Sequence, residues 1–394
     1  MSIFLLLGGI FLITFLLGIL LEKIRIPWIF AALIVGLGLA FHNPFTNLTS
    51  SETFKFLAWL GMYFLLFLIG FELDLEKIKK LGKFIIKFTF FIIFFEAIFG
   101  SLLIHFVFGY DWFISILVAL SFATVGEAVL IPILDEFKLT KTKLGQSILG
   151  IGTLDDIIEV FAIVVAILAV PILTEGIEKT INIWELLVIL LSLLGLFLLA
   201  FGIIKLRKRI SRMKVRKIEA ISLLVLAIFF LFIGFGGFAE AAAVGALLAG
   251  IAVKNFLPER RIEAIEPQIK FLTYAFFGPI FFFWVGVDTN VNYLLTAPLL
   301  VLLVIAVAYS AKILASYLIG KKELGKKPSI LMGIALGVRF STSIVIIKFL
   351  FEKALIGAEL YSVLIASTIA FKFIIPFLLS FLIQKWEIGF KTAE

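Results

Sequence analysis

Long apolar runs, separated by short polar clusters, dominate the chain. Cutting the sequence wherever polar clusters interrupt these runs gives thirteen segments, most of them near the roughly 20 residues that a helix needs to cross a bilayer core. The segments are 3–21, 27–41, 56–73, 84–108, 113–134, 147–172, 183–206, 218–234, 238–253, 271–287, 293–319, 330–351 and 360–384. No basic residue precedes the first segment and no small-residue cleavage site follows it, so we predict a retained helix rather than a signal peptide. The pattern predicts an all-α polytopic membrane protein.

The positions of lysine and arginine test this division independently, because short cytoplasmic loops collect basic residues and external loops do not. The loops after odd-numbered segments, together with the C-terminal tail, hold 26 Lys and Arg. The loops after even-numbered segments hold two, Lys179 and Lys353, besides Lys55 at the edge of the third segment. This alternation predicts thirteen transmembrane helices in the cytoplasmic membrane, with the N-terminus outside and the C-terminus in the cytoplasm.

Composition narrows the function classes. Hydrophobic residues make up 62% of the chain and charged residues 16%, which lies far outside the range of soluble domains. With no cysteine and two histidines, the chain has no thiolate metal site and little material for a zinc centre or a catalytic triad. We therefore expect neither an enzyme nor a cofactor. The net charge of +8 follows from the loop asymmetry and does not indicate nucleic acid. All the loops between the segments are short, so we expect no soluble regulatory domain.

Several ionisable residues remain inside the predicted helices, where each costs roughly 2.5 to 3.5 kcal/mol on insertion scales. The acids are Glu96, Glu127, Asp155, Asp156 and Glu159, with Glu240 in a short segment, and the bases include Lys312, Arg339, Lys348 and Lys372. Any one of them could be half of a structural ion pair between helices. A cluster of such groups favours a functional site, because every member must face a partner, the protein interior or water.

The densest cluster is the stretch GTLDDIIEV, residues 152–160. Adjacent aspartates point about 100° apart on a helix, whereas Asp155 and Glu159, four residues apart, share a face. Like charges this close resist ionising together, so at least one carboxylate should exchange a proton near neutral pH. An acid that holds either a proton or a cation can exchange the two by competition. A buried lysine can lose its proton, so Lys312 can neutralise an aspartate in one step and release it in another.

Two segments carry small polar residues and a glycine in mid-span. Segment 113–134 contains SFATVGEAVLIPIL and segment 330–351 contains LGVRFSTSIVI. A helix can unwind at membrane depth only where the freed backbone lines a cavity, which predicts two broken helices. Close packing between helices is the alternative explanation for such residues.

Equal spacings link the charged and interrupted segments. The spacing from Glu96 to Asp156 equals the spacing from Lys312 to Lys372. Likewise, Thr124 precedes Asp156 by the same interval as Phe340, next to Arg339, precedes Lys372. Segments four to six thus share a layout with segments eleven to thirteen. An offset of seven helices inverts the second copy, and inverted repeats with broken helices are typical of secondary transporters.

At these residues the chain resembles the cation:proton antiporter superfamily, and most closely its bacterial sodium/proton antiporters of the Nha type, which have a double-aspartate motif. The similarity runs nearly end to end, through motifs that follow in the family's order. They are LEKIRIPWIFAALIVGLGLA, LAWLGMYFLLFLIGFELDLEKIKK, FATVGEAVLIPIL, GTLDDIIEV, AVGALLAGIAV, FFGPIFFFWVGVD and AKILASYLIG.

The resemblance implies two crossing broken helices, an ion-translocating core of 84–172 and 293–384, and a scaffold or dimerisation domain of 1–83 and 183–287. It also implies a homodimer and an electrogenic, elevator-like exchange of Na⁺ or Li⁺ for H⁺ in pH homeostasis. Asp156 matches the acid that binds Na⁺, Asp155 the first acid of the motif, Thr124 a polar residue of the broken helix, and Lys312 the lysine that pairs with the aspartates.

Other features depart from the family's pattern. Glu127 and Glu159 are additional acids, Glu240 stands where a small residue is expected, and Lys372 near Pro376 is unusual. These residues, together with Glu96 and Arg339, are further core charges that could be ion pairs or ligands. The alternatives are a potassium/proton antiporter of the same superfamily and, from another class, a cation channel or a sodium-coupled carrier of an organic solute.

Overall fold

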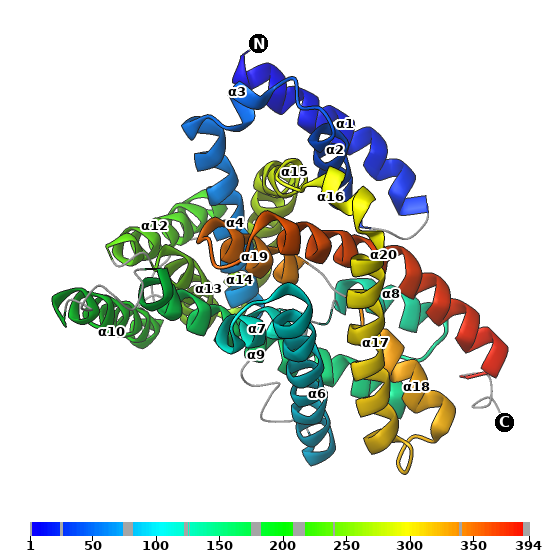
Figure 1. Cartoon of the computed structure of the whole chain (residues 1–394). Helices are drawn as coiled ribbons and strands as arrows, with labels where there is room; N and C mark the ends of the chain where they lie inside the picture. Colours follow the sequence, from blue (N-terminus) through cyan, green and yellow to red (C-terminus); the bar gives the residue numbers. More distant parts are fainter. Residues whose placement is uncertain are drawn as a thin grey trace. The chain divides into compact units, whose positions relative to one another are not determined.

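The computed structural model of the chain is helical throughout the parts that it describes, with no strand among them (Figure 1). It describes residues 2–23, 27–73, 82–121, 125, 127–174, 183–207, 217–238, 241–338 and 341–388. The helices are α1 (Ile3–Lys23), α2 (Phe30–Ala40), α3 (Thr46–Thr49), α4 (Glu52–Glu72), α6 (Lys83–Phe108), α7 (Trp112–Leu120), α8 (Glu127–Glu136), α9 (Lys143–Thr174), α10 (Ile183–Lys205), α12 (Ile218–Gly237), α13 (Ala242–Phe256), α14 (Glu259–Lys270), the π-helix η1 (Phe271–Phe277), α15 (Gly278–Val287), α16 (Val291–Thr296), α17 (Pro298–Gly320), α18 (Lys326–Ala335), α19 (Ser341–Glu352) and α20 (Ala358–Trp386). This confirms the all-α fold class.

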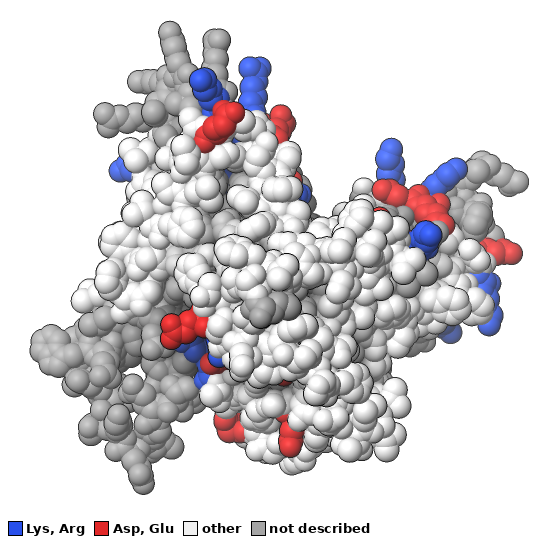
Figure 2. Space-filling view, turned by 90° about the horizontal axis from the view of Figure 1, so that it is seen from above, with Lys and Arg blue, Asp and Glu red and all other residues white. Residues whose placement is uncertain are grey.

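Seven of the described helical runs are long and apolar enough to cross a membrane. Large apolar side chains are exposed along them, among them Phe4 at 81%, Phe90 at 71% and Phe377 at 76%. Figure 2 shows broad uncharged areas on one face of the molecule, with the charged side chains gathered in separate groups. Such a surface suits contact with lipid chains. Shorter apolar helices accompany the seven, and the count of thirteen spans stays a prediction.

One predicted loop is a helix. The polar composition of residues 254–270 predicts a connection between two spans, but α14 occupies most of this range and continues through η1 and α15 as one helical run from Glu259 to Val287. The sequence argument missed this helix because its composition is as polar as that of a loop. Its Ile265 and Ile269, four residues apart, are buried on one face while none of the charged side chains of the helix is buried, which is amphipathic helical periodicity.

The chain divides into two compact units. The first unit consists of Met1–Leu17, Ile29–Leu73 and Ile163–Val287. The second unit consists of Gly18–Trp28, Asp74–Ala162 and Asp288–Glu394. Helices α2, α4, α10 and α12 to α15 belong to the first, and α6 to α8 and α16 to α20 to the second.

Glycines let helices of the first unit approach backbone to backbone. A Cβ on Gly250 of α13 would lie 2.6 Å from the backbone nitrogen of Phe71 on α4, and one on Gly61 of α4 would lie 2.7 Å from the carbonyl oxygen of Phe277. Real Cβ atoms do not come this close to backbone atoms, so these positions require glycine. Small residues at helix contacts are a usual packing device in membrane proteins.

We expect Gly250→Leu to destabilise the protein by about 1–3 kcal/mol, because α4 and α13 must separate to admit the side chain. The lower midpoint of thermal unfolding in detergent measures this effect. Gly195→Leu on α10 is the matched control, because a Cβ there meets nothing within 4 Å. Equal midpoints for the two variants would contradict the packing argument.

The second unit contains the two segments that the sequence predicts to be interrupted, and each is a pair of helices. The first is α7 with α8, and the second is α18 with α19. The same backbone turn ends α8 and α19. After α8, Lys138 has φ 56°, and the amide of Leu139 donates to the carbonyl oxygen of Leu134. After α19, Ala354 has φ 55°, and the amide of Leu355 donates to the carbonyl oxygen of Leu350. Both are Schellman-type helix ends.

The separation of these two turns along the chain equals the separation of other matching positions. The interval from Lys138 to Ala354 equals the interval from Gly109 to Gly325, the two described glycines with positive φ. Equivalent positions of the sequence repeat, such as Glu96 and Lys312, are separated by the same interval. The two groups of segments predicted to be copies therefore share local backbone geometry at these turns as well as spacing.

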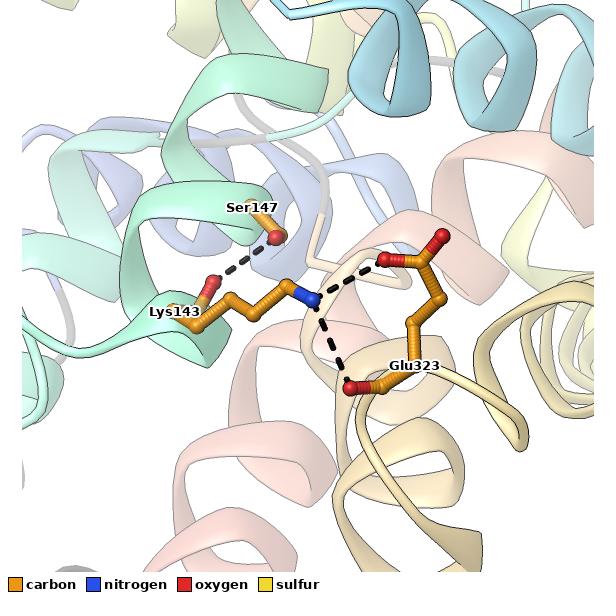
Figure 3. A network of polar contacts seen from close by, with 3 residues as sticks. All are labelled: Lys143, Ser147 and Glu323. Carbon is orange, nitrogen blue, oxygen red and sulfur yellow. Dashed lines mark hydrogen bonds and ion pairs between the residues drawn. The ribbon is translucent and has the colours of Figure 1, made fainter.

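Contacts between loops follow the predicted sidedness. Tyr110 and Gly357 lie after the fourth and twelfth segments, both predicted external, and the amide of Gly357 donates to the Tyr110 hydroxyl at 2.7 Å. Lys143 and Glu323 lie in loops predicted cytoplasmic, and Lys143 Nζ is 2.9 Å from Glu323 Oε2, while Ser147 Oγ donates to the Lys143 carbonyl (Figure 3). The orientation of the termini stays a prediction.

Candidate functional site

A buried ion pair joins α6 to α17 in the second unit. Lys312 Nζ lies 3.3 Å from Glu96 Oε1, and each side chain is only 1% exposed. The lysine also donates to the carbonyl oxygen of Leu336 at 2.5 Å. Leu336 is the C-cap of α18, where carbonyl groups have no partner within the helix and the helix dipole is negative. Lys312 is thus bound both to a carboxylate and to the end of an interrupted helix.

Sequence spacing predicts this pair only in part. The spacing makes Glu96 and Lys312 equivalent positions of the two copies, and the structure brings these two equivalent residues into contact. The predicted partner of Lys312 is the aspartate site, and that pairing stays a prediction. No local signal could have matched Lys312 with Glu96, because they lie far apart in the sequence and several intramembrane acids competed for the role.

A narrow crevice of about 10 Å³, roughly the space of one water molecule, reaches Glu96 of the ion pair. Its lining comes from α6 and α17 and consists of Glu96, Gly100, Leu103, Val304, Val307, Ala308 and Ala311. Most of these side chains are small or aliphatic, so Glu96 is the polar group of the lining. The crevice leaves open space next to one of the two buried charges.

The aspartates lie on α9, well inside the helix. Asp155 is 2% exposed, and it follows Thr153, whose hydroxyl donates to the carbonyl oxygen of Leu149 at 3.0 Å. The helix runs through Asp156 and Glu159 without interruption, so neither aspartate lies in a loop. This agrees with the pattern of apolar runs, which places both aspartates well inside segment 147–172.

The remaining predicted residues are located only in part. Asp156 and Glu159 on α9, Glu127 at the start of α8 and Lys372 on α20 have described backbone, but their side chains lie outside the described part. Thr124, Arg339 and Glu240 lie outside the described residues altogether. The structure thus describes three side chains of the predicted site, those of Glu96, Asp155 and Lys312.

A second buried lysine has partners that no sequence motif assigned. Lys348 on α19 is fully buried, contacts Asp288 and lies 2.7 Å from Glu352 Oε1. Its ammonium also faces the rings of Phe351 and Tyr361 at 5.0 and 5.4 Å. The four-residue spacing of Lys348 and Glu352 was an available signal for part of this cluster, although the predicted segment 330–351 ends one residue before Glu352 and the helix includes it.

An all-helical membrane protein with two interrupted helical segments, and with buried charges at the end of α18 in one of them, has the construction of a secondary transporter. The comparison with known proteins gives the family. A family model described as "Sodium/hydrogen exchanger, transmembrane" matches residues 11–385. The chain belongs to this family, and it is a cation/proton antiporter rather than an enzyme.

Individual relatives agree with this placement. The chain is similar to the probable Na⁺/H⁺ antiporter 3 of Methanocaldococcus jannaschii, at 29% identity over 92% of each chain. It is also similar to the K⁺/H⁺ antiporter subunit KhtU of Bacillus subtilis, at 25% identity over 84% of this chain and 81% of that protein. The fold matches the solved structure of the sodium proton antiporter MjNhaP1 from M. jannaschii, with a TM-score of 0.65 and 16% identity over 100% of this chain and 99% of that one.

Proposed function

We propose that the protein exchanges Na⁺ or Li⁺ for H⁺ across the cytoplasmic membrane, with Asp156 and Asp155 as the shared site. The observation that carries this proposal is the deep burial of Asp155 within α9, in the same unit as Lys312 and the two interrupted segments. A carboxylate at such depth is stable only with a proton, a cation or a fixed positive charge nearby. Competition between proton and cation for these acids then couples the two fluxes.

The residues have distinct roles in this proposal. Asp156 binds the cation, Thr124 adds an oxygen ligand, and Asp155 holds a proton when the cation leaves. Lys312 positions the end of α18 through the Leu336 carbonyl, while Glu96 supplies its counter-charge. Glu96 neutralises Lys312 in this structure, so that both aspartates are able to bind protons, and in another step of the cycle Lys312 neutralises an aspartate. Two protons then leave for each monovalent cation, which makes the exchange electrogenic.

The division of the chain into two compact units supports a mechanism of alternating access. We propose that the second unit, which contains α6 to α8 and α16 to α20, is the ion-carrying core and moves against the first as an elevator. The two copies would be inverted about an axis that passes near Glu96 and Lys312, because equivalent residues of a two-fold pair meet only close to the axis. Two further parts complete the proposal: a homodimer, which rests on the family resemblance, and an external N-terminus, which rests on the distribution of Lys and Arg over the loops.

Potassium is the second candidate substrate. The similarity to a protein named as a K⁺/H⁺ antiporter subunit favours it, and no described side chain distinguishes the two cations. Cavity size and ligand number set such a choice.

A flux assay in proteoliposomes tests the proposal. We expect an imposed pH gradient to drive uptake of Na⁺ and Li⁺, and a membrane potential to change the rate because net charge moves. Faster exchange with K⁺ would favour the second candidate. Exchange that ignores the membrane potential would contradict the two-proton scheme, and cation flux without proton movement would contradict antiport by this site.

A further inference from the structure

The buried cluster around Lys348 marks the point where the chain enters the second unit. Val287 is the last residue of the first unit here and Asp288 is the first of the second. Asp288 contacts Lys348, which is fully buried on α19 and also pairs with Glu352 one turn further along the same helix. The Asp288 side chain remains 31% exposed, so this ion pair links an accessible carboxylate to a buried base.

The next residues are fixed to the second unit as well. The amide of Asn290 donates to Ser362 Oγ on α20 at 2.7 Å, and Thr289 is 2% exposed. Asp288 and Asn290 therefore connect the entering chain to two different helices, α19 and α20. Glu352 differs from them, because it lies on the same helix as Lys348 and its ion pair joins no second segment.

The chain on the other side of Val287 is held in the first unit. Helix α15 packs directly on the backbone of α2, where a Cβ on Gly286 would lie 2.6 Å from the backbone nitrogen of Leu37 and one on Gly36 would lie 3.0 Å from that of Val287. The chain is therefore held up to Val287 by packing within the first unit, and from Asp288 onward by the ion pair within the second unit. A single peptide link separates them.

A similar arrangement marks the crossing that follows α4, with the units exchanged. Glu72, at the end of α4, lies 3.1 Å from Lys270 Nζ in the first unit, and Lys270 also pairs with Glu266 on its own helix at 2.7 Å. The interval from Glu72 to Asp288 is the same as the interval between the two copies of the repeat, so the two acids are equivalent positions. Both crossings therefore have one lysine, one acid from the crossing chain and one acid four residues from the lysine.

We propose that Asp288 is a positioning residue that anchors the chain to the second unit through Lys348, and that Glu72 anchors the crossing after α4 to the first unit through Lys270. Movement between the units is then taken up at the link between Val287 and Asp288, and the anchor keeps that movement from reaching α19, one half of an interrupted segment. The inference rests on the proposed alternating access of the two units.

Two variants that each remove one carboxylate beside Lys348 distinguish the effect of losing the anchor from the effect of losing a negative charge. Asp288→Asn removes the ion pair that crosses between segments and keeps the one with Glu352, whereas Glu352→Gln removes the ion pair within α19 and keeps the one with Asp288. Hydrogen exchange followed by mass spectrometry in lipid nanodiscs reports the local effect. We expect amides of residues 288–290 to exchange about tenfold faster in Asp288→Asn and at the original rate in Glu352→Gln. Glu72→Gln and Glu266→Gln form the equivalent pair for the other anchor.

Transport provides the second measurement. We expect Asp288→Asn to lower the turnover of exchange about tenfold with an unchanged KM for the cation, and Glu352→Gln to retain the turnover. Equal hydrogen exchange in the two variants, or a change in KM with constant turnover, would overturn the proposal. Failure of the proposed function would show differently, as absent cation/proton exchange in the unmodified protein, and the hydrogen-exchange comparison would still decide whether the anchor exists.

Discussion

Asp156→Asn is expected to abolish coupled exchange. The asparagine keeps the shape of the side chain but can neither ionise nor release a proton, so the competition between proton and cation disappears. Proteoliposomes with an internal pH dye should show no change when Na⁺ is added outside, at any pH where the unmodified protein responds. The substitution changes the charge of the site and not the backbone, because α9 continues through position 156 and a helix accommodates asparagine there as well as aspartate.

A matched control lies in the same unit. Asp135, in the last turn of α8, is exposed and accepts a hydrogen bond from the Thr140 hydroxyl at 2.9 Å. Asp135→Asn makes the same chemical change outside the proposed site and should leave exchange intact. If Asp156→Asn still exchanges protons for cations at the rate of this control, the assignment of the ion site to Asp156 is wrong.

The architecture was largely predictable because membrane helices obey strong constraints on length and polarity. Backbone groups in lipid must be satisfied within the helix, so apolar runs of sufficient length become helices, as α6 does, starting at Lys83 where the pattern places the start at 84. Mid-span Ser, Thr and Gly correctly indicated the two interrupted segments. The sequence spacing predicts two copies, and the matching helix ends at Lys138 and Ala354 have the same separation as the predicted copies.

The polar contacts were harder to predict, because they depend on which helices become neighbours. Helix α14 has the composition of a loop, and only the spacing of Ile265 and Ile269 indicated a packed face. The partners of Lys348 include Asp288, which is distant in the sequence, and such a pairing has no signature within one helix. Charge pairs between distant segments remain ambiguous in sequence whenever several acids and bases share the membrane interior.

Removing either partner of the Glu96–Lys312 ion pair should destabilise the protein strongly, because the other charge then stays buried without this counter-charge. Both side chains are 1% exposed, so removing one partner leaves a buried charge without this counter-charge, which typically costs about 3–5 kcal/mol. We therefore expect Glu96→Gln and Lys312→Met each to lower the thermal midpoint in detergent strongly. The double variant should be more stable than the sum of the two losses predicts, because both charges of the pair are then absent.

The exposed ion pair of Lys143 and Glu323 tests whether burial or interatomic distance sets the coupling energy of such a pair. Its atoms are closer, at 2.9 Å against 3.3 Å, but the two side chains are 60% and 48% exposed. Solvent screening limits such a pair to about 1 kcal/mol or less, so the same double-mutant cycle should show little coupling there. Equal coupling in the two cycles would mean that water reaches Glu96 and Lys312, and that the charges on the two copies are not held in a dry interior.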